Sequence, residues 1–298
     1  MHRREGREHG FAPAEIEAPA DARLRIEVVN HTTAAAILCT ITSLLFIRAA
    51  WAVDPFEFEV YPAQTVGHGK VEIESLNSFI AKGNTQGGAG TSAGDLASDR
   101  MYRTALELTY GLTDKIEAAA YLNLARPNGD VLQYAGSKFR LRGSLFEPGE
   151  LPLDLGWYAE LEWHKTPQFD DNELELELRP IVAKDFRRFS LWLNPIFEKA
   201  IFVGPNRDKG FEFGYVAGIY YNWRQRLSPG VEFYGGPGLI DNADPLHDQQ
   251  HYIFPVVKGE FPGGLEYNFG VGIGLTRGSD QVITKLNIEF EHFLGTLF

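Results

Sequence analysis

The sequence predicts an all-β fold, a closed antiparallel transmembrane β-barrel of about twelve strands. Two observations predict it. Runs in which apolar and polar residues alternate recur from residue 70 onward, which is the period of strands with one apolar and one polar face. The connections between these runs alternate between long and short, as loops and turns do at the two ends of such a barrel.

The first four strands are predicted at 71–80, 101–110, 115–124 and 137–145. In each of these runs the charged residues fall on one of the two faces, and a lipid-facing surface would exclude them. The alternation therefore assigns an inner face to each strand. The inward ionisable residues are Glu72, Glu74, Arg103, Glu107, Arg140 and Arg142.

The fifth and sixth strands, 151–164 and 172–183, show the alternation most clearly. In the sixth, Leu174, Leu176 and Leu178 lie opposite a charged face that consists of Glu173, Glu175, Glu177 and Arg179. Slipping the register by one residue would turn that charged face into lipid, and an arginine at the bilayer midplane costs about 2 to 4 kcal/mol. The register is therefore strongly specified.

Six further strands are predicted at 189–199, 210–221, 230–236, 250–258, 263–275 and 281–293. In the eleventh strand, glycines occupy alternate positions from Gly270 to Gly274. An inward glycine lets another element approach or keeps the lumen open. In the last strand, Leu286, Ile288 and Phe290 alternate with polar residues.

Three pairs of connections show the predicted difference in length best. Each pair is a long loop followed along the chain by a short turn. The pairs are 81–100 with 111–114, 123–136 with 146–150, and 164–171 with 184–188.

The composition suits a strand-rich protein without a nucleic-acid partner. Aromatic residues make up 13% of the chain and there are 31 glycines. The mean hydropathy of −0.20, with no long apolar run after the amino-terminal region, argues against a helical membrane protein. A net charge of −12 and the absence of a lysine or arginine run argue against phosphate binding.

Two motifs and the last strand resemble a known group. The motifs are Tyr-Gly-Leu-Thr-Asp-Lys-Ile-Glu at 110–117 and Lys-Phe-Arg-Leu-Arg at 138–142, and the last strand precedes a terminal Phe298. They resemble outer-membrane transporters of proteobacteria, the group that includes the MetA-pathway phenol-degradation proteins. The resemblance implies a Gram-negative outer-membrane barrel at 70–298, with long external loops and short periplasmic turns. The implied partners are outer-membrane lipid, lipopolysaccharide, small solutes, and a barrel-assembly machinery that recognises the strand ending at Phe298.

Residues 1–52 are predicted to be an N-terminal extension and signal peptide that directs export. The apolar stretch 32–47 is too short to span a bilayer comfortably. Ala50 and Ala52 are small residues at the two positions that a signal peptidase needs, so cleavage is expected after Ala52. The single cysteine, Cys39, lies in this leader, and the mature chain is therefore expected to have no disulfide.

Residues 53–69 are predicted to be a periplasmic N-terminal segment. Its stretch Phe-Glu-Phe-Glu-Val-Tyr at 56–61 alternates as a strand does. Three interpretations stay open: the stretch extends the first strand, forms a periplasmic tail, or enters the lumen as a short plug.

Function is expected on the lumenal face, because lipid-facing positions serve solvation in the membrane. The wall of strands five and six could attract cations or hold a divalent ion. Alternatively, its carboxylates pair with arginines and fill the lumen, which we favour because a twelve-stranded barrel has a modest interior. The predicted lumen-lining residues are Arg140, Arg142, Glu160, Glu162, His164, Glu173, Glu175, Glu177 and Arg179.

His247 and His251 are weak candidates for a metal site, since two histidines four residues apart flank Asp248. The spacing is similar to that of the zinc-protease motif, which needs a helix to place both imidazoles on one face. Here the residues lie in or beside a predicted external loop. We therefore expect no metal, no cofactor, no catalytic residue and no enzyme activity.

The sequence favours an outer-membrane channel or transporter-like barrel for passive passage of small solutes, with hydrophobic and cationic molecules as candidates. The first alternative is a structural or surface-display barrel with a filled lumen. The second is an outer-membrane hydrolase.

Overall fold

The computed structural model describes residues 54–85, 96–165, 174–201, 210–223 and 226–293. Three predictions fall outside these residues and stay predictions. They concern the signal peptide at 1–52, the lumen-lining Glu173 and the terminal Phe298.

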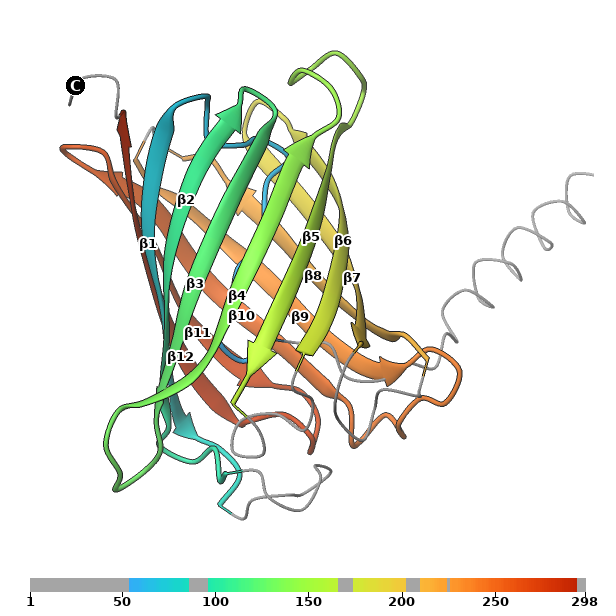
Figure 1. Ribbon diagram of the computed structural model, residues 1–298. Coiled ribbons are helices and arrows are strands. Elements are labelled where there is room, and N and C mark those ends of the chain that lie inside the picture. The colour runs from blue at the N-terminus through green and yellow to red at the C-terminus, as the bar shows by residue number, and fades with distance from the viewer. Residues whose placement is uncertain (1–53, 86–95, 166–173, 202–209, 224–225, 294–298) are drawn as a thin grey trace, which may run out of the picture. The chain divides into compact units, whose positions relative to one another are not determined.

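Twelve strands form a closed barrel in which sequence neighbours pair antiparallel and β1 pairs with β12 (Figure 1). The predicted fold class is thus confirmed. The strands are β1 (Lys70–Lys82), β2 (Tyr102–Thr113), β3 (Ile116–Arg126), β4 (Gln133–Ser144), β5 (Asp154–His164), β6 (Leu174–Asp185), β7 (Phe189–Ala200), β8 (Glu212–Tyr221), β9 (Ser228–Leu239), β10 (Gln250–Phe261), β11 (Leu265–Gly274) and β12 (Val282–Phe293). None of the described segments forms a helix with the length and apolar character needed to cross a membrane.

The two faces of each strand differ as the alternation predicts. On β6, Leu178 is 39% exposed on the outside, whereas its neighbour Arg179 is 1% exposed on the inside. Phe139 of β4 and Trp163 of β5 belong to the same outer face and are 65% and 63% exposed. Large apolar side chains therefore cover the outside of the barrel and polar side chains face inward, which is the arrangement that a lipid environment requires.

We call the end with the connections 114–115 and 262–264 the turn end, and the other the loop end. The lengths of the connections depart from the prediction at the second pair, where the connection at the turn end is longer than the one at the loop end. The expected loop 123–136 is reduced to 127–132 because both β3 and β4 run further than predicted. A tight turn with Gly129 at φ 77° closes it, whereas the expected turn 146–150 widens to 145–153.

The chain before β1 occupies the interior of the barrel. We call residues 54–66 the luminal segment; the start of the blue trace in Figure 1 follows it inside the strands. Phe56, Phe58 and Val60 are at most 4% exposed and pack in one cluster with inward residues of the wall. Part of the range 53–69, predicted to be periplasmic, is thus inside the lumen, since its apolar side chains find partners there.

Candidate functional site

Tyr61 of the luminal segment contacts several polar and charged side chains of the barrel wall. Its hydroxyl lies 3.0 Å from Nη1 of Arg140 and 3.3 Å from the hydroxyl of Tyr121. The guanidinium carbons of Arg140, Arg142 and Arg179 lie 5.1, 4.8 and 5.7 Å from the centre of its ring. Three cations over one aromatic ring bind the segment to the wall of β4 and β6.

A second set of contacts to the same wall begins at Glu57. Its carboxylate accepts a hydrogen bond from Lys138 at 3.1 Å and forms an ion pair with Arg179 at 3.0 Å. Asp54, near the start of the luminal segment, also pairs with Lys138. These ion pairs are buried, so each charge depends on its partner for compensation.

The opposite wall holds the segment at Phe58. The backbone carbonyl of Phe58 accepts hydrogen bonds from Lys285 at 2.9 Å and Asn287 at 3.2 Å, both on β12. The ring of Phe58 lies 5.1 Å from that of Phe254 and 5.3 Å from that of Tyr234. The luminal segment is therefore tied to opposite sides of the barrel, on β4, β6 and β12.

The segment is fixed to the turn end by a backbone contact. The N–H of Val66 donates to Glu117 of β3 at 2.7 Å. Glu117 in turn accepts from Arg140 at 2.9 Å and from Arg142 at 2.7 Å. The buried carboxylate of Glu117 thus links the Val66 end of the luminal segment to Arg140 and Arg142 of β4.

The other predicted lumen-lining residues that the structure describes lie on the inner face of the wall, where they pair with one another or with Lys138. Glu160 and Glu162 lie 3.3 and 3.4 Å from the ammonium group of Lys138. His164 lies 3.1 Å from Glu175, and Arg179 pairs with Glu177 on the same strand. Among the described residues of β5 and β6, Glu160, Glu162 and Glu177 are therefore paired with Lys138 or Arg179, which is the arrangement of the filled-lumen interpretation.

Lys138 is a buried lumenal cation that the predicted lumen-lining residues lack. Its ammonium group lies within ion-pair distance of four carboxylates, those of Asp54, Glu57, Glu160 and Glu162. The available signal was its position two residues before Arg140, which places both side chains on the same face of β4.

The two histidines proposed as weak metal candidates do not converge on one site. His247 is an exposed loop residue 3.0 Å from Asp248. His251 belongs to β10 and bonds instead to Gln249 at 2.9 Å and Tyr215 at 3.2 Å. The reason is that β10 begins at Gln250, so no helix brings the imidazoles to one face.

Glycines of β11 make room for the aromatic contacts of the luminal segment. A Cβ on Gly272 would collide with the ring of Phe254, which packs on Phe58. A Cβ on Gly270 would lie 2.7 Å from Cγ1 of Val256. Of the two roles proposed for these glycines, the structure therefore shows the close approach of another element.

No protein-family model matches this chain, and a comparison with curated proteins finds no match either. Solved structures do resemble it. The COG4313 outer membrane channel from Pseudomonas putida F1 has a TM-score of 0.53 at 12% identity, covering 81% of this chain and 100% of that one. The KdgM porin has a TM-score of 0.48 at 10% identity, covering 74% and 98%. The outer membrane protein Omp33 of Acinetobacter baumannii has a TM-score of 0.44 at 9% identity, covering 75% and 98%.

These likenesses bear on the fold. At 12% identity, the likeness to the COG4313 channel shows a shared fold and says nothing of the solute. The chain therefore has the fold of a known outer-membrane channel, a twelve-stranded closed barrel.

Proposed function

We propose that this protein is an outer-membrane channel for passive passage of small solutes, closed by the luminal segment. The observation that carries the proposal is the position of this segment, which bonds to opposite sides of the lumen through Tyr61 and Phe58. A solute that crosses the barrel must pass the place the segment occupies. Opening therefore requires the segment to move.

The bonding of the segment is compatible with movement. In the described residues its backbone adds no strand to the sheet and is held by separate contacts to side chains such as Asn194, Lys285 and Glu117. Breaking these contacts with side chains leaves the hydrogen bonds between the strands of the barrel intact. Two pockets of about 190 and 200 Å³ open at the turn end, and the first is lined by Ala63 and Thr65 of the segment itself.

Two features support hydrophobic or cationic solutes. Aromatic rings gather around the segment at Phe58, Tyr234, Tyr252 and Phe254, and they offer faces for apolar molecules and cations. The resemblance to the MetA-pathway phenol-degradation group points in the same direction. A small aromatic solute is our specific proposal.

The test is conductance of the purified protein in planar bilayers. We expect small, rare openings for the wild-type protein and larger, longer ones for Tyr61→Ala, which removes the ring under the three guanidinium groups. Deleting residues 54–63 should enlarge the conductance further. The control is His68→Ala, an exposed side chain that bonds to the Leu112 carbonyl at 2.8 Å outside the lumen.

A barrel with a permanently filled lumen is the competing proposal, and the dense ion pairs around Lys138 favour it. The two proposals differ in the deletion variant. If folded protein lacking 54–63 leaves the bilayer silent, side chains of the wall fill the lumen and the channel proposal is wrong. The protein would then serve as a structural or surface-display barrel.

The hydrolase alternative has little support. A Gly-x-Ser-x-Gly pattern occurs at 90–94, within a glycine-rich connection outside the described residues. Such a pattern carries a nucleophile only on a strand-to-helix turn beside a base.

The remaining partners follow from the outer surface and the resemblance. The exposed apolar side chains of the strands, including Phe139 and Leu141, suit contact with outer-membrane lipid. We propose lipopolysaccharide around the loop end and recognition of the last strand by a barrel-assembly machinery. Export by cleavage after Ala52 is part of the same proposal.

A further inference from the structure

A row of glutamates crosses five neighbouring strands on the inside of the barrel. The strand register places Glu74 of β1 directly opposite Glu107 of β2 and Glu289 of β12. It continues through Glu266 of β11 to Glu260 of β10. Like charges directly opposite each other destabilise a strand pair, so this row calls for compensating positive charge.

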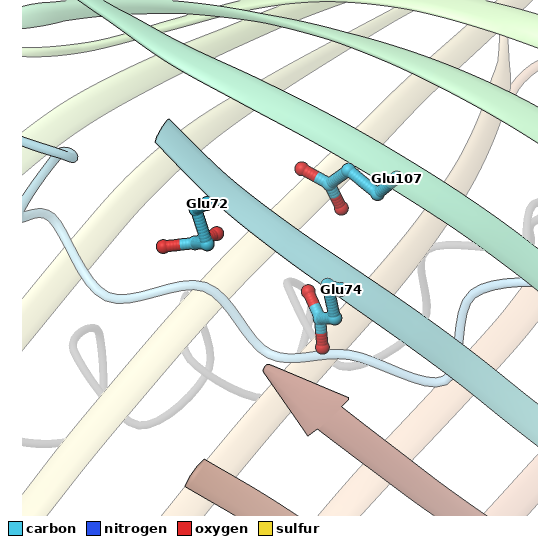
Figure 2. Close-up of side chains that lie close together, drawn as sticks. All are labelled: Glu72, Glu74 and Glu107. Carbon is cyan, nitrogen blue, oxygen red and sulfur yellow. The ribbon is translucent and has the colours of Figure 1, made fainter. Parts of the chain in front are cut away.

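Three carboxylates at one end of this wall converge. Glu72, Glu74 and Glu107 each offer an oxygen, and these oxygens lie within 4.8 Å of one another. In Figure 2, Glu72 and Glu74 project from β1, and Glu107 projects from β2. Oxygens bound to Ca²⁺ lie at about 2.3 to 2.6 Å from the ion, so two opposed ligands are about 5 Å apart. The observed spacing therefore fits a calcium ion.

An independent observation concerns the second oxygen of Glu107. Glu107 is 3% exposed; its Oε1 forms an ion pair with Arg140 at 2.6 Å and accepts a hydrogen bond from Thr109 at 2.5 Å. Its Oε2 is buried and has no hydrogen-bond partner. A buried carboxylate oxygen without a donor is costly, and a bound cation would satisfy it.

Protein cations compensate this group only in part. In the part of the chain that the structure describes, no lysine, arginine or histidine forms an ion pair with Glu72 or Glu74. Arg140, the partner of Glu107, is shared with Glu117 at 2.9 Å. This contrasts with the wall of β5 and β6, where Lys138 and Arg179 meet the carboxylates directly.

We propose that Glu72, Glu74 and Glu107 bind a divalent cation, and that the cation is Ca²⁺. The ion would supply the positive charge that the glutamate row lacks and would link β1 to β2, beside the β1–β12 closure. The site is independent of whether the lumen conducts solutes.

The test is calorimetric titration of CaCl₂ into detergent-purified protein that has been treated with a chelator. We expect one ion per barrel and at least tenfold weaker binding in Glu74→Gln. The matched control, Glu266→Gln, removes a carboxylate of the same row outside the converging group and should bind as the wild type does. Calcium should also raise the melting temperature of the wild type and of Glu266→Gln, but not that of Glu74→Gln.

Several results would overturn the proposal. One is the absence of calcium binding by the wild type. Another is equal weakening in Glu74→Gln and Glu266→Gln, which would indicate a diffuse acidic surface. If Glu74→Gln stabilises the protein in chelator while calcium has no effect on the wild type, the carboxylates share protons instead. Equal affinity for Mg²⁺, which needs shorter bonds of about 2.0 to 2.1 Å, would reject calcium as the ion.

Discussion

Tyr61 and Asn194 are joined by two hydrogen bonds across the lumen. The backbone N–H of Tyr61 donates to Oδ1 of Asn194 at 2.8 Å, and Nδ2 of Asn194 donates to the carbonyl of Tyr61 at 3.0 Å. One side chain of β7 thus satisfies both polar groups of a residue that belongs to no strand. Because Asn194 is fully buried, no bulk water can replace it.

Replacing Asn194 with alanine should loosen the luminal segment while leaving the barrel folded. Both backbone groups of Tyr61 lose their partner, at about 1 to 3 kcal/mol for each unsatisfied group. Hydrogen exchange followed by mass spectrometry should show faster exchange in residues 54–66 and unchanged exchange in the strands. Asn222→Ala, at a connection of the turn end, is the control. Equal protection of the segment in both variants would show that Asn194 does not hold it.

Lys138→Met should destabilise the protein far more than the same change at an exposed lysine. Lys138 is the shared partner of four buried carboxylates, and removing one member of a buried ion pair costs about 3 to 5 kcal/mol. Lys115, which lies 2.9 Å from Glu147 at the surface, is the matched control, and its replacement should change the stability little because water solvates both charges.

The measurement for this pair is urea unfolding in lipid vesicles, followed by tryptophan fluorescence. Adding Glu160→Gln to Lys138→Met should recover part of the lost stability, because one uncompensated charge is removed. Similar unfolding midpoints for the two lysine variants would contradict the importance of Lys138.

Gly272→Ala should disturb the aromatic side of the luminal segment. The new methyl group collides with the ring of Phe254, and displacement of that ring removes its contact with Phe58. Overpacking of this kind costs about 1 to 3 kcal/mol. Gly67→Ala is the control, since its methyl group would meet only Lys70 at 3.6 Å. Thermal unfolding compares them, and equal melting temperatures would mean that the ring relaxes freely.

Strand positions and faces followed from the sequence because they depend on local alternation. Leu178 and Arg179 occupy opposite faces of β6 as predicted, since neighbouring side chains of a strand point in opposite directions. The residues at which the strands begin and end were less predictable. β9 extends from Ser228 to Leu239, beyond the predicted 230–236, because backbone pairing with β8 and β10 carries the strand through glycines and a proline.

Which residues fill the lumen was decided by the tertiary structure. The alternation at 56–61 was equally compatible with a strand, a tail and a plug, because the partners that decide between them, such as Asn194, Lys285 and Asn287, lie far away in sequence. The same holds for the convergence of Glu72, Glu74 and Glu107, which requires the register of β1 with β2. The sequence by itself determined a barrel wall with an apolar outside and a charged inside, since that pattern is written residue by residue. Only the closed fold decided which charges meet across the interior, because those contacts join residues that the chain keeps far apart.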